Sequence, residues 1–417
     1  MSIKLSDPIT LPNGVVLANR LVKAAMSEGF ADADNNATER FVTLYRRWSR
    51  SGAGLLLTGN VQVDRLHLER PGNVVADAAS DRAALRAFAK AGTEAGNHLW
   101  MQLAHTGRQV SDRINPAPLA PSAVEINLPR GLGFSFGPPR EMREADIRTA
   151  IGQFAAAAKI ARETGFTGVE LHAAHGYLFS QFLSPLSNRR TDAWGGPLEN
   201  RARLLLETLA AVRAAVGPDF PIGIKLNSSD FQTGGFTNDE AVRLVEWLND
   251  AGLDLLELSG GSLEQPKMAG LALGEEGADA RPASTIAREA YFVDYAAKVR
   301  AAAKMPVLVT GGFRTVAGMA EALETGALDL VGIGRPMLVE TDLPRRILAG
   351  SVEVAPRPEE ALQVFQILPW FNAQFERLAD GLEPDLALTA EAAQALFGPR
   401  EDAVFNALAA RRERVVA

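Results

Sequence analysis

The sequence contains no cysteine among its 417 residues. This absence excludes disulfides, iron–sulfur clusters, thiolate zinc sites and a cysteine nucleophile. Long apolar runs are also missing, because no stretch reaches the ~20 consecutive apolar residues of a membrane span. The first ten residues, M-S-I-K-L-S-D-P-I-T, lack the apolar core of a secretory signal. We therefore expect a cytoplasmic protein with no membrane partner.

The chain contains fewer basic residues than acidic residues. The chain has 43 Lys and Arg residues against 50 Asp and Glu residues, which gives a formal net charge of −7. Because a phosphate backbone demands a basic surface, we expect no nucleic-acid partner and predict a small-molecule substrate instead. The hydrophobic fraction of 47% is ordinary and supplies ample material for a core.

Short aliphatic runs alternate with longer amphipathic segments rich in Ala and Arg. The predicted strands are Leu21–Met26, Gly54–Val61, Leu99–Leu103, Thr167–His172, Pro221–Leu226, Leu253–Leu258, Pro306–Thr310 and Leu328–Ile333. Helical patterns lie between them near residues 38–52, 80–96, 144–165, 198–216, 237–252, 286–303 and 315–326, and from about 341. Eight strand-then-helix units over ~330 residues predict an α/β fold, the (β/α)8 TIM barrel. An open doubly wound sheet is disfavoured, because no glycine-rich loop follows the first strand.

Three segments lie outside this repeat. Residues 7–18 contain Asn13-Gly14 between apolar residues, which predicts an N-terminal β-hairpin that plugs the bottom of the barrel. Residues 105–140 follow the third strand, are rich in Pro and Gly, and are too long for an ordinary connection, so we expect a lid or rim. We divide the chain into a barrel, residues 1–354, and a helical extension, residues 355–417, that packs on the barrel or on a neighbouring subunit of a homo-oligomer.

The residues that point most clearly to a chemical function lie at the end of the fourth predicted strand and directly after it. His172, His175 and Tyr177 lie within six residues of one another, although the whole chain has five histidines. Histidines that cap the strand end are the structural alternative. Metal ligation is another, since Glu170 alternates with His172, but no further acidic or thiol ligand is adjacent and we expect no metal. A phenol with a pKa of about 10 stays protonated at neutral pH, so the three side chains fit polarisation of a carbonyl and protonation of an activated alkene.

Two glycine motifs stand where barrels commonly bind phosphate, after the seventh and eighth strands. Thr310–Phe313 has the sequence T-G-G-F, and Gly332–Pro336 has the sequence G-I-G-R-P. Glycines let backbone N–H groups approach an anion, and Arg335 can form a bidentate pair with it. Each motif alone fits a simple turn about as well, but together they predict a phosphate site.

Lys225 and Gln102 end the fifth and third strands within apolar runs. A lysine there is rarely buried without a partner, although its stem can also carry the charged head to solvent at the strand end. The functional interpretation is a cation beside an electron-rich cofactor, with the glutamine amide on a heterocycle. A satisfied glutamine at the barrel rim is the alternative for Gln102.

These motifs together resemble the old yellow enzyme family, the NADH:flavin oxidoreductases or FMN-dependent ene-reductases. The resemblance covers residues 5–343 and rests on H-A-A-H-G-Y-L-F-S-Q-F-L-S-P-L-S-N-R-R-T-D-A-W-G-G-P-L-E-N-R, on Q-L-A-H-T-G-R, and on G-G-F followed by G-I-G-R-P. It implies non-covalent FMN at the carboxyl end of the barrel, with NADPH or NADH as hydride donor.

The resemblance also assigns roles to residues. Contacts to FMN fall to Ala25, Met26, Ser27, Gly59, Gln102, Lys225, Gly311, Gly312, Gly334 and Arg335. His172 and His175 would bind the substrate carbonyl, hydride would pass from flavin N5 to the β-carbon, and Tyr177 would protonate the α-carbon. The implied substrates are α,β-unsaturated carbonyl compounds. A dienoyl thioester reductase, a nitro-compound reductase and a non-catalytic flavin-binding barrel are the alternatives.

Two positions depart from the family pattern. Ser27 stands where many relatives carry Thr or Cys, a position that tunes the flavin potential. Lys225 replaces an arginine that is common in some branches, which keeps the charge and loses the bidentate fork.

Overall fold

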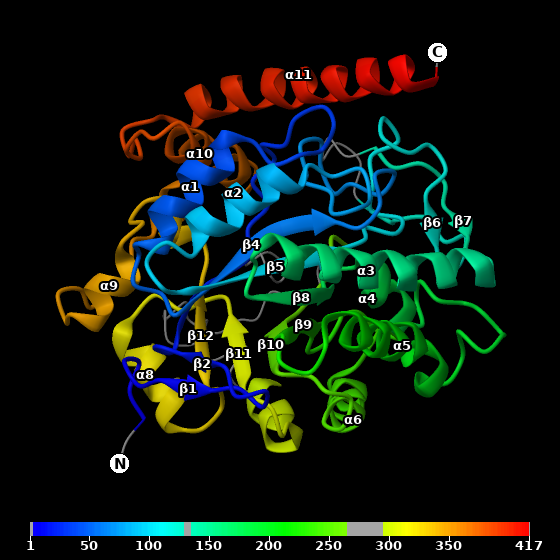
Figure 1. The fold of residues 1–417 in the computed structure, drawn as a ribbon, viewed down its shortest axis with the longest axis horizontal. Coiled ribbons are helices and arrows are strands. Elements are labelled where there is room, and N and C mark those ends of the chain that lie inside the picture. The colour runs from blue at the N-terminus through cyan, green and yellow to red at the C-terminus, as the bar shows by residue number, and fades with distance from the viewer. Residues whose placement is uncertain (1–2, 129–134, 265–294, 417) are drawn as a thin grey trace.

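The computed structural model describes residues 3–128, 135–264 and 295–416 (Figure 1). Eight parallel strands form a closed barrel in the order β10-β11-β12-β3-β4-β5-β8-β9. Their bounds are β3 Leu21–Lys23, β4 Leu55–Gln62, β5 His98–Ala104, β8 Gly168–Ala173, β9 Ile222–Asn227, β10 Leu255–Ser259, β11 Val307–Thr310 and β12 Leu330–Ile333. Each strand overlaps one of the eight predicted runs, so the (β/α)8 prediction is confirmed.

Helices cover the outside of the barrel. Their bounds are α1 Glu39–Ser49, α2 Arg82–Gly92, α3 Glu144–Thr164, α4 Leu178–Leu183, α5 Leu198–Val216, α6 Asn238–Leu248, α8 Val316–Glu324, α9 Leu343–Leu348, α10 Val364–Ala379 and α11 Ala390–Val416, with the 3-10 helices η2 Arg335–Leu338 and η3 Pro358–Ala361. Residues 295–302 are also helical, and the earlier part of the pattern predicted at 286–303 lies outside the described residues. The other helical predictions are confirmed to within a few residues at their ends. Within the described ranges, none of the helices combines the length and apolarity that crossing a membrane requires.

Side-chain alternation along the strands decides what fills the barrel. One buried cluster inside it is formed by Val22, Leu55, Leu57, Trp100, Leu255, Leu308 and Leu330. The antiparallel hairpin of β1 Ile9–Thr10 and β2 Val16–Leu17 adds Leu11 and Leu17 to this cluster. Its turn places Gly14 at a φ of +88°, which favours glycine. The hairpin therefore closes one end of the barrel, as predicted, and leaves the carboxyl ends of the strands for a site.

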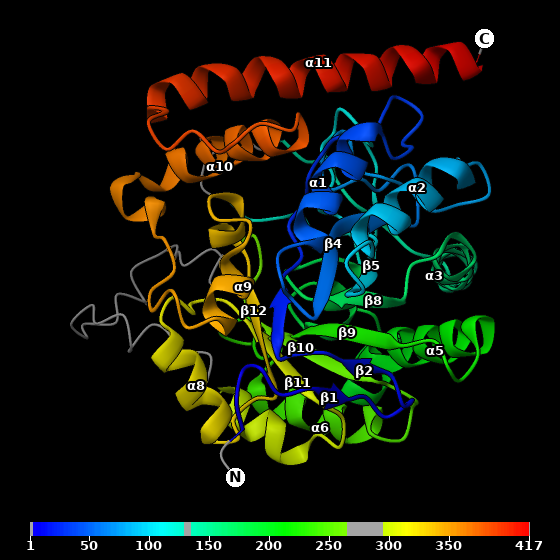
Figure 2. The ribbon, with the colours of Figure 1, turned by 60° about the vertical axis from the view of Figure 1, so that its left-hand side comes forward.

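The two C-terminal helices lie on the side of the barrel that carries α1 and α2 (Figures 1 and 2). In α10, the Phe375 ring lies 5.9 Å from the ring of Trp48 in α1 and 6.2 Å from that of Phe30, centroid to centroid. Trp370 and Phe371 of α10 are buried as well. Three ion pairs join α11 to the loops that follow β3, β4 and β5: Arg411 with Asp34, Glu401 with Arg70, and Asp402 with Arg113. The extension thus contacts three loops at the open end of the barrel.

Candidate active site

A tight turn at the end of β8 brings His172, His175 and Tyr177 together. His172 is buried within the strand, and the chain then turns through His175 at a φ of +60°, a left-handed conformation that costs a non-glycine residue about 1 kcal/mol. The backbone N–H of His175 donates to Asn227 Oδ1 at 3.1 Å, which holds the turn. As a result, the His172 ring lies 4.9 Å from the His175 ring and 4.8 Å from the Tyr177 ring, between centroids.

Both imidazoles are held in the neutral form. Burial lowers the pKa of His172 well below its usual value, and the charges of His175 and Lys225 add to the shift. Burial and Lys225 lower the pKa of His175 in the same way. The Ala174 N–H donates to His172 Nδ1 at 3.3 Å, so the proton of this neutral ring is on Nε2. His172 can therefore donate a hydrogen bond without carrying a charge.

Tyr177 stays protonated for a similar reason. Burial raises the pKa of its phenol well above the usual value, and the negative charge of Glu69 raises it further. Asn60 Nδ2 lies 3.5 Å from the phenol oxygen and also donates to Glu69 Oε2 at 3.0 Å. The hydroxyl of Ser27 donates to the same carboxylate oxygen. The sequence motifs gave no sign of Asn60, near the end of β4, or of Glu69, in the loop after it. Asn60 contacts Tyr177 of the turn after β8, and it contacts Glu69 as well.

Gln102 and Lys225 both lie inside the barrel, each with a carboxyl partner. Gln102 Nε2 donates to Glu170 Oε2 at 2.6 Å, and Lys225 Nζ donates to Glu257 Oε1 at 2.9 Å. One oxygen of Glu170 is thus engaged with Gln102. Sequence reasoning missed Glu257, although the alternation of L-L-E-L-S places it on the same face as Ser259.

The loops after β11 and β12 have the backbone that a phosphate cradle needs. Gly311 and Gly312 have φ angles of +118° and +85°, so both adopt left-handed conformations next to the strand end. The buried Thr310 Oγ1 has no hydrogen-bond partner within the described residues. Burial lowers the pKa of Arg335, whose guanidinium lies 4.0 Å from Glu359. Left-handed glycines, an unpaired hydroxyl and a half-buried guanidinium fit an anionic group.

The other residues assigned to the flavin lie close together. A Cβ on Gly334 would lie 3.7 Å from Met26 Sδ, and one on Gly59 would lie 2.4 Å from the carbonyl oxygen of Met26. Strand β4 and the loops after β3 and β12 therefore meet around Met26, and Ala25 packs on the cluster inside the barrel. Gly59 has an added structural reason to be glycine, because its missing side chain leaves room for Glu28, which accepts its N–H at 3.0 Å.

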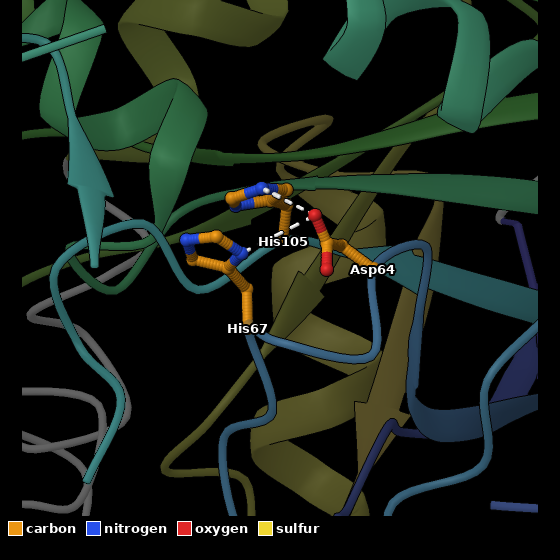
Figure 3. A group of neighbouring side chains, drawn as sticks. All are labelled: Asp64, His67 and His105. Atoms are coloured by element: carbon orange, nitrogen blue, oxygen red, sulfur yellow. Dashed lines mark ion pairs between the residues drawn. The ribbon is translucent and has the colours of Figure 1, made fainter. Parts of the chain in front are cut away.

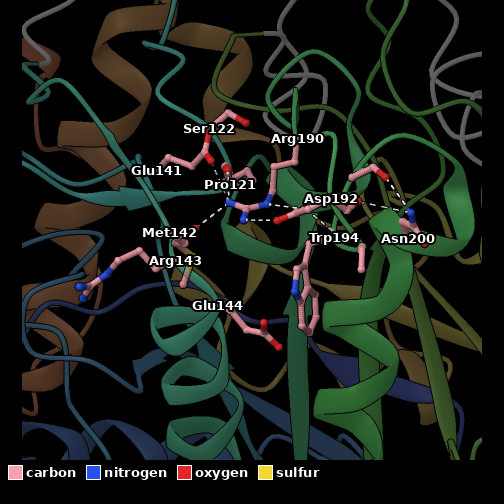
Figure 4. A network of polar contacts seen from close by, with 12 residues as sticks. Pro121, Ser122, Glu141, Met142, Arg143, Glu144, Arg190, Asp192, Trp194 and Asn200 are labelled. Carbon is pink, nitrogen blue, oxygen red and sulfur yellow. Dashed lines mark hydrogen bonds and ion pairs between the residues drawn. The ribbon is translucent and has the colours of Figure 1, made fainter.

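Arg190 fixes the 105–140 insertion to the barrel (Figure 4). Its guanidinium donates to the carbonyl of Pro121 within the insertion at 2.9 Å and to that of Met142 just after the insertion at 2.6 Å. The remaining donors form a bidentate pair with Asp192 at 3.0 and 2.6 Å. Short strands β6 Leu119–Ala120 and β7 Arg140–Glu141 pair in parallel at the same place. Residues 129–134 of the insertion lie outside the described residues.

A second polar cluster, Asp64, His67 and His105, has the residue types of a metal site (Figure 3). Asp64 Oδ2 lies 3.3 Å from His67 Nδ1 and 4.0 Å from His105 Nε2. The other nitrogen of each ring accepts a backbone N–H, from Leu119 on His67 Nε2 and from Gly107 on His105 Nδ1, both at 3.0 Å.

A neutral imidazole has one acceptor nitrogen, and in both rings the backbone already uses it. The nitrogens facing Asp64 therefore carry protons and cannot ligate a metal. Burial lowers the pKa of His105 to about 3, with His67 adding to the shift and Asp64 opposing it, so this ring is neutral at pH 7. The cluster is a carboxylate that faces two ring nitrogens, and the bond from Leu119 N–H to His67 ties the insertion to the loop after β4.

The fold places the protein among the TIM barrels, with uncharged donors gathered at the carboxyl ends of the strands. The chain belongs to the NADH:flavin oxidoreductase / NADH oxidase family, whose model matches residues 4–353. The C-terminal extension lies outside that match.

Individual relatives support the same family. An NADH-dependent flavin oxidoreductase, iliE, of Neonectria sp. is 41% identical over 373 residues, which are 85% of this chain and 48% of the relative, so the chain spans about half of that protein. The iliE protein of Hypocrea jecorina is 39% identical over 362 residues, 82% of this chain and 88% of the relative. The structure of an old yellow enzyme homologue from Zymomonas mobilis superposes with a TM-score of 0.70 at 25% identity, over 86% of this chain and 96% of that one.

Proposed function

We propose that the protein is an FMN-dependent ene-reductase that uses NADH or NADPH to reduce the C=C bond of α,β-unsaturated carbonyl compounds. The observation that carries the proposal is the convergence of two neutral imidazoles and one protonated phenol, with ring centroids 4.9 and 4.8 Å apart. Such a set polarises a carbonyl oxygen and supplies a proton without introducing charge of its own.

When bound, FMN would accept hydride from the nicotinamide and deliver it to the β-carbon of the substrate. The residues that would hold it are Ala25, Met26, Ser27, Gly59, Gln102 and Lys225 around the ring, and Gly311, Gly312, Gly334 and Arg335 at the phosphate. The left-handed glycines and the half-buried Arg335 support the phosphate assignment. Lys225, which is paired with Glu257, would contribute a buried positive charge to the bound flavin.

The protein's own residues orient and protonate the substrate. His172 Nε2–H donates to the carbonyl oxygen, and His175 assists from the turn, where its Nε2 lies 2.7 Å from Ser259 Oγ. Electron density drawn to that oxygen makes the β-carbon electrophilic. Tyr177 then protonates the α-carbon, and its position beside Asn60 keeps the hydroxyl directed towards the site.

The test begins with the purified protein, which should be yellow and retain FMN. After reduction with NADH or NADPH under nitrogen, 2-cyclohexenone should reoxidise the flavin. Tyr177→Phe should slow the reoxidation by ~10²-fold, about 2.7 kcal/mol of barrier, because it removes the proton donor. His172→Ala should weaken enone binding and slow the reaction. The matched control is His98→Ala, at the amino end of β5 and away from the carboxyl ends of the strands, and it should leave both unchanged.

Three outcomes would contradict the proposal. A colourless protein that takes up no FMN would exclude a flavoenzyme. Reoxidation at the parent rate in Tyr177→Phe and His172→Ala would show that the proton-donating and carbonyl-binding roles assigned to these residues are wrong. Reduced flavin that reacts with a nitro-compound or a dienoyl thioester, but not with any enone, would transfer the assignment to another flavin-dependent reduction.

A further inference from the structure

Four polar side chains are buried inside the barrel next to His172, whose register partner on β9 is Lys225. They are Gln102 on β5, Glu170 on β8, Lys225 on β9 and Glu257 on β10, and none is more than 4% exposed. The bonds from Gln102 and Lys225 occupy one oxygen on each carboxyl group. The other two oxygens, Glu170 Oε1 and Glu257 Oε2, are buried without a donor within the described residues.

The two carboxyl groups reach each other across β9, the strand that separates theirs. Glu170 lies opposite Gly223 in the register of β8 and β9, and Gly223 lies opposite Leu255 of β10. Because Gly223 has no side chain, Glu170 can extend over it, and a Cβ there would lie 3.6 Å from Glu170 Cγ. The two carboxyl groups interact electrostatically, and Glu170 Oε1 and Glu257 Oε2 are the oxygens left without a donor within the described residues. Two ionised carboxyl groups could not satisfy these oxygens, since each group only accepts, whereas one proton between them would.

The surrounding charges also require a proton. With both carboxyl groups ionised, the set would hold one excess negative charge away from water, which is strongly unfavourable. Burial raises the pKa of Glu170 well above its usual value, and the charge of Glu257 raises it further, while Lys225 acts in the opposite direction. His172 and His175, the next titratable groups on β8 and its turn, are neutral. They cannot compensate the charge.

Lys23 on β3 is the remaining nearby cation, and it faces the other way. Its Nζ donates to the Leu57 carbonyl at 2.8 Å and lies 4.2 Å from the centre of the Trp48 ring, between the barrel and α1. Lys225 is therefore the cation that balances the carboxyl pair.

We propose that Glu170 and Glu257 share a single proton, which makes the set of Gln102, Glu170, Lys225 and Glu257 electrically neutral and fixes the ammonium of Lys225 on the strand next to His172. Glu170 and Glu257 are positioning residues. Their effect on a bound flavin rests on the proposed function, whereas the shared proton does not.

The shared proton is tested in the protein without cofactor. At pH 8 the infrared spectrum should contain the carbonyl stretch of a protonated carboxyl group, and Glu170→Gln should remove it. This replacement imitates the protonated acid, because its amide oxygen can accept from Gln102 while its amide N–H donates to Glu257. A wild-type spectrum without such a band at pH 8 would overturn the proposal whether or not the variant folds.

Unfolding against pH gives a second measurement. A raised folded-state pKa means that stability from this group is lost as pH rises, since the unfolded carboxyl group ionises at about 4.3 and the folded one does not. Between about pH 5 and 8, the wild-type unfolding constant should therefore grow by about tenfold per pH unit relative to Glu170→Gln. The exposed control Glu246→Gln on α6 should stay parallel to the wild type. Parallel curves for Glu170→Gln would contradict the shared proton.

The charge of the set is tested with FMN bound. Glu170→Gln keeps the set neutral, so the midpoint potential of the flavin should not move. Adding Glu257→Gln leaves Lys225 uncompensated, and the potential should shift to more positive values, because a positive charge favours the reduced flavin. No shift in the double variant would refute the positioning role. Failure to bind FMN would instead count against the proposed function, and the infrared band would still decide the shared proton.

Discussion

Replacing Arg190 by Met should loosen the 105–140 insertion. The side chain of Arg190 is only 6% exposed, and its guanidinium holds the carbonyl of Pro121 in the insertion, the carbonyl of Met142 just after it, and the carboxylate of Asp192. Removing one partner of a buried ion pair costs roughly 3–5 kcal/mol. Asp192 is 48% exposed, so water recovers part of its solvation and the lower end of that range applies. We expect a loss of about 3 kcal/mol, mainly from the two carbonyls left without donors.

The neighbouring arginine supplies a matched control, because Arg189 is exposed and Arg190 is buried. Arg189→Met should change the free energy of unfolding by less than about 0.5 kcal/mol. The two variants are compared by urea denaturation and by limited proteolysis, and Arg190→Met should also be cleaved sooner within the insertion. Equal stability of the two variants, or unchanged proteolysis in Arg190→Met, would refute the assignment of Arg190 as the anchor.

Two further predictions concern pH. His105 has a folded pKa of about 3 against about 6.5 unfolded, so the unfolded state alone takes up the proton between these values and stability falls as pH drops from 6.5. In acid denaturation between pH 4 and 6.5, His105→Gln should lower this slope by up to about 1.4 kcal/mol per pH unit, and an unchanged slope would argue against a neutral His105. For the reaction with enone, His172, His175 and Tyr177 should not change charge between about pH 6.5 and 10, so stopped-flow reoxidation should be flat there. A bell-shaped pH profile centred near neutrality would show that one of these three side chains does change its charge in that range.

The barrel could be predicted from sequence because each strand is a short aliphatic run, and such runs record burial on both faces of a parallel sheet. His172, His175 and Tyr177 were also accessible, since one tight turn places neighbours in sequence side by side. The polar partners of these site residues could not be predicted from the sequence. Glu257 lies 32 residues from Lys225, and Asn60 lies 117 residues from Tyr177.

Those contacts depend on the closure of the barrel and on how its loops meet, which no local pattern specifies. Asp64, His67 and His105 illustrate the same limit. Their residue types suggest a metal, and only the backbone N–H groups of Leu119 and Gly107 show which ring nitrogens carry protons. Ser27 was assigned to the flavin from its position in the motif, and nothing in that motif predicted that its hydroxyl donates to Glu69.

The ion pairs of α11 have a consequence for engineering this protein. The loops that follow β3, β4 and β5 each form an ion pair with α11, a helix that the family model does not cover. Loops are the parts that barrel enzymes usually exchange to change substrate range. Here a transplanted loop would leave Glu401 or Asp402 without its arginine, or Arg411 without its aspartate. Chimeras with other family members should therefore transfer these loops and the C-terminal helix as one unit.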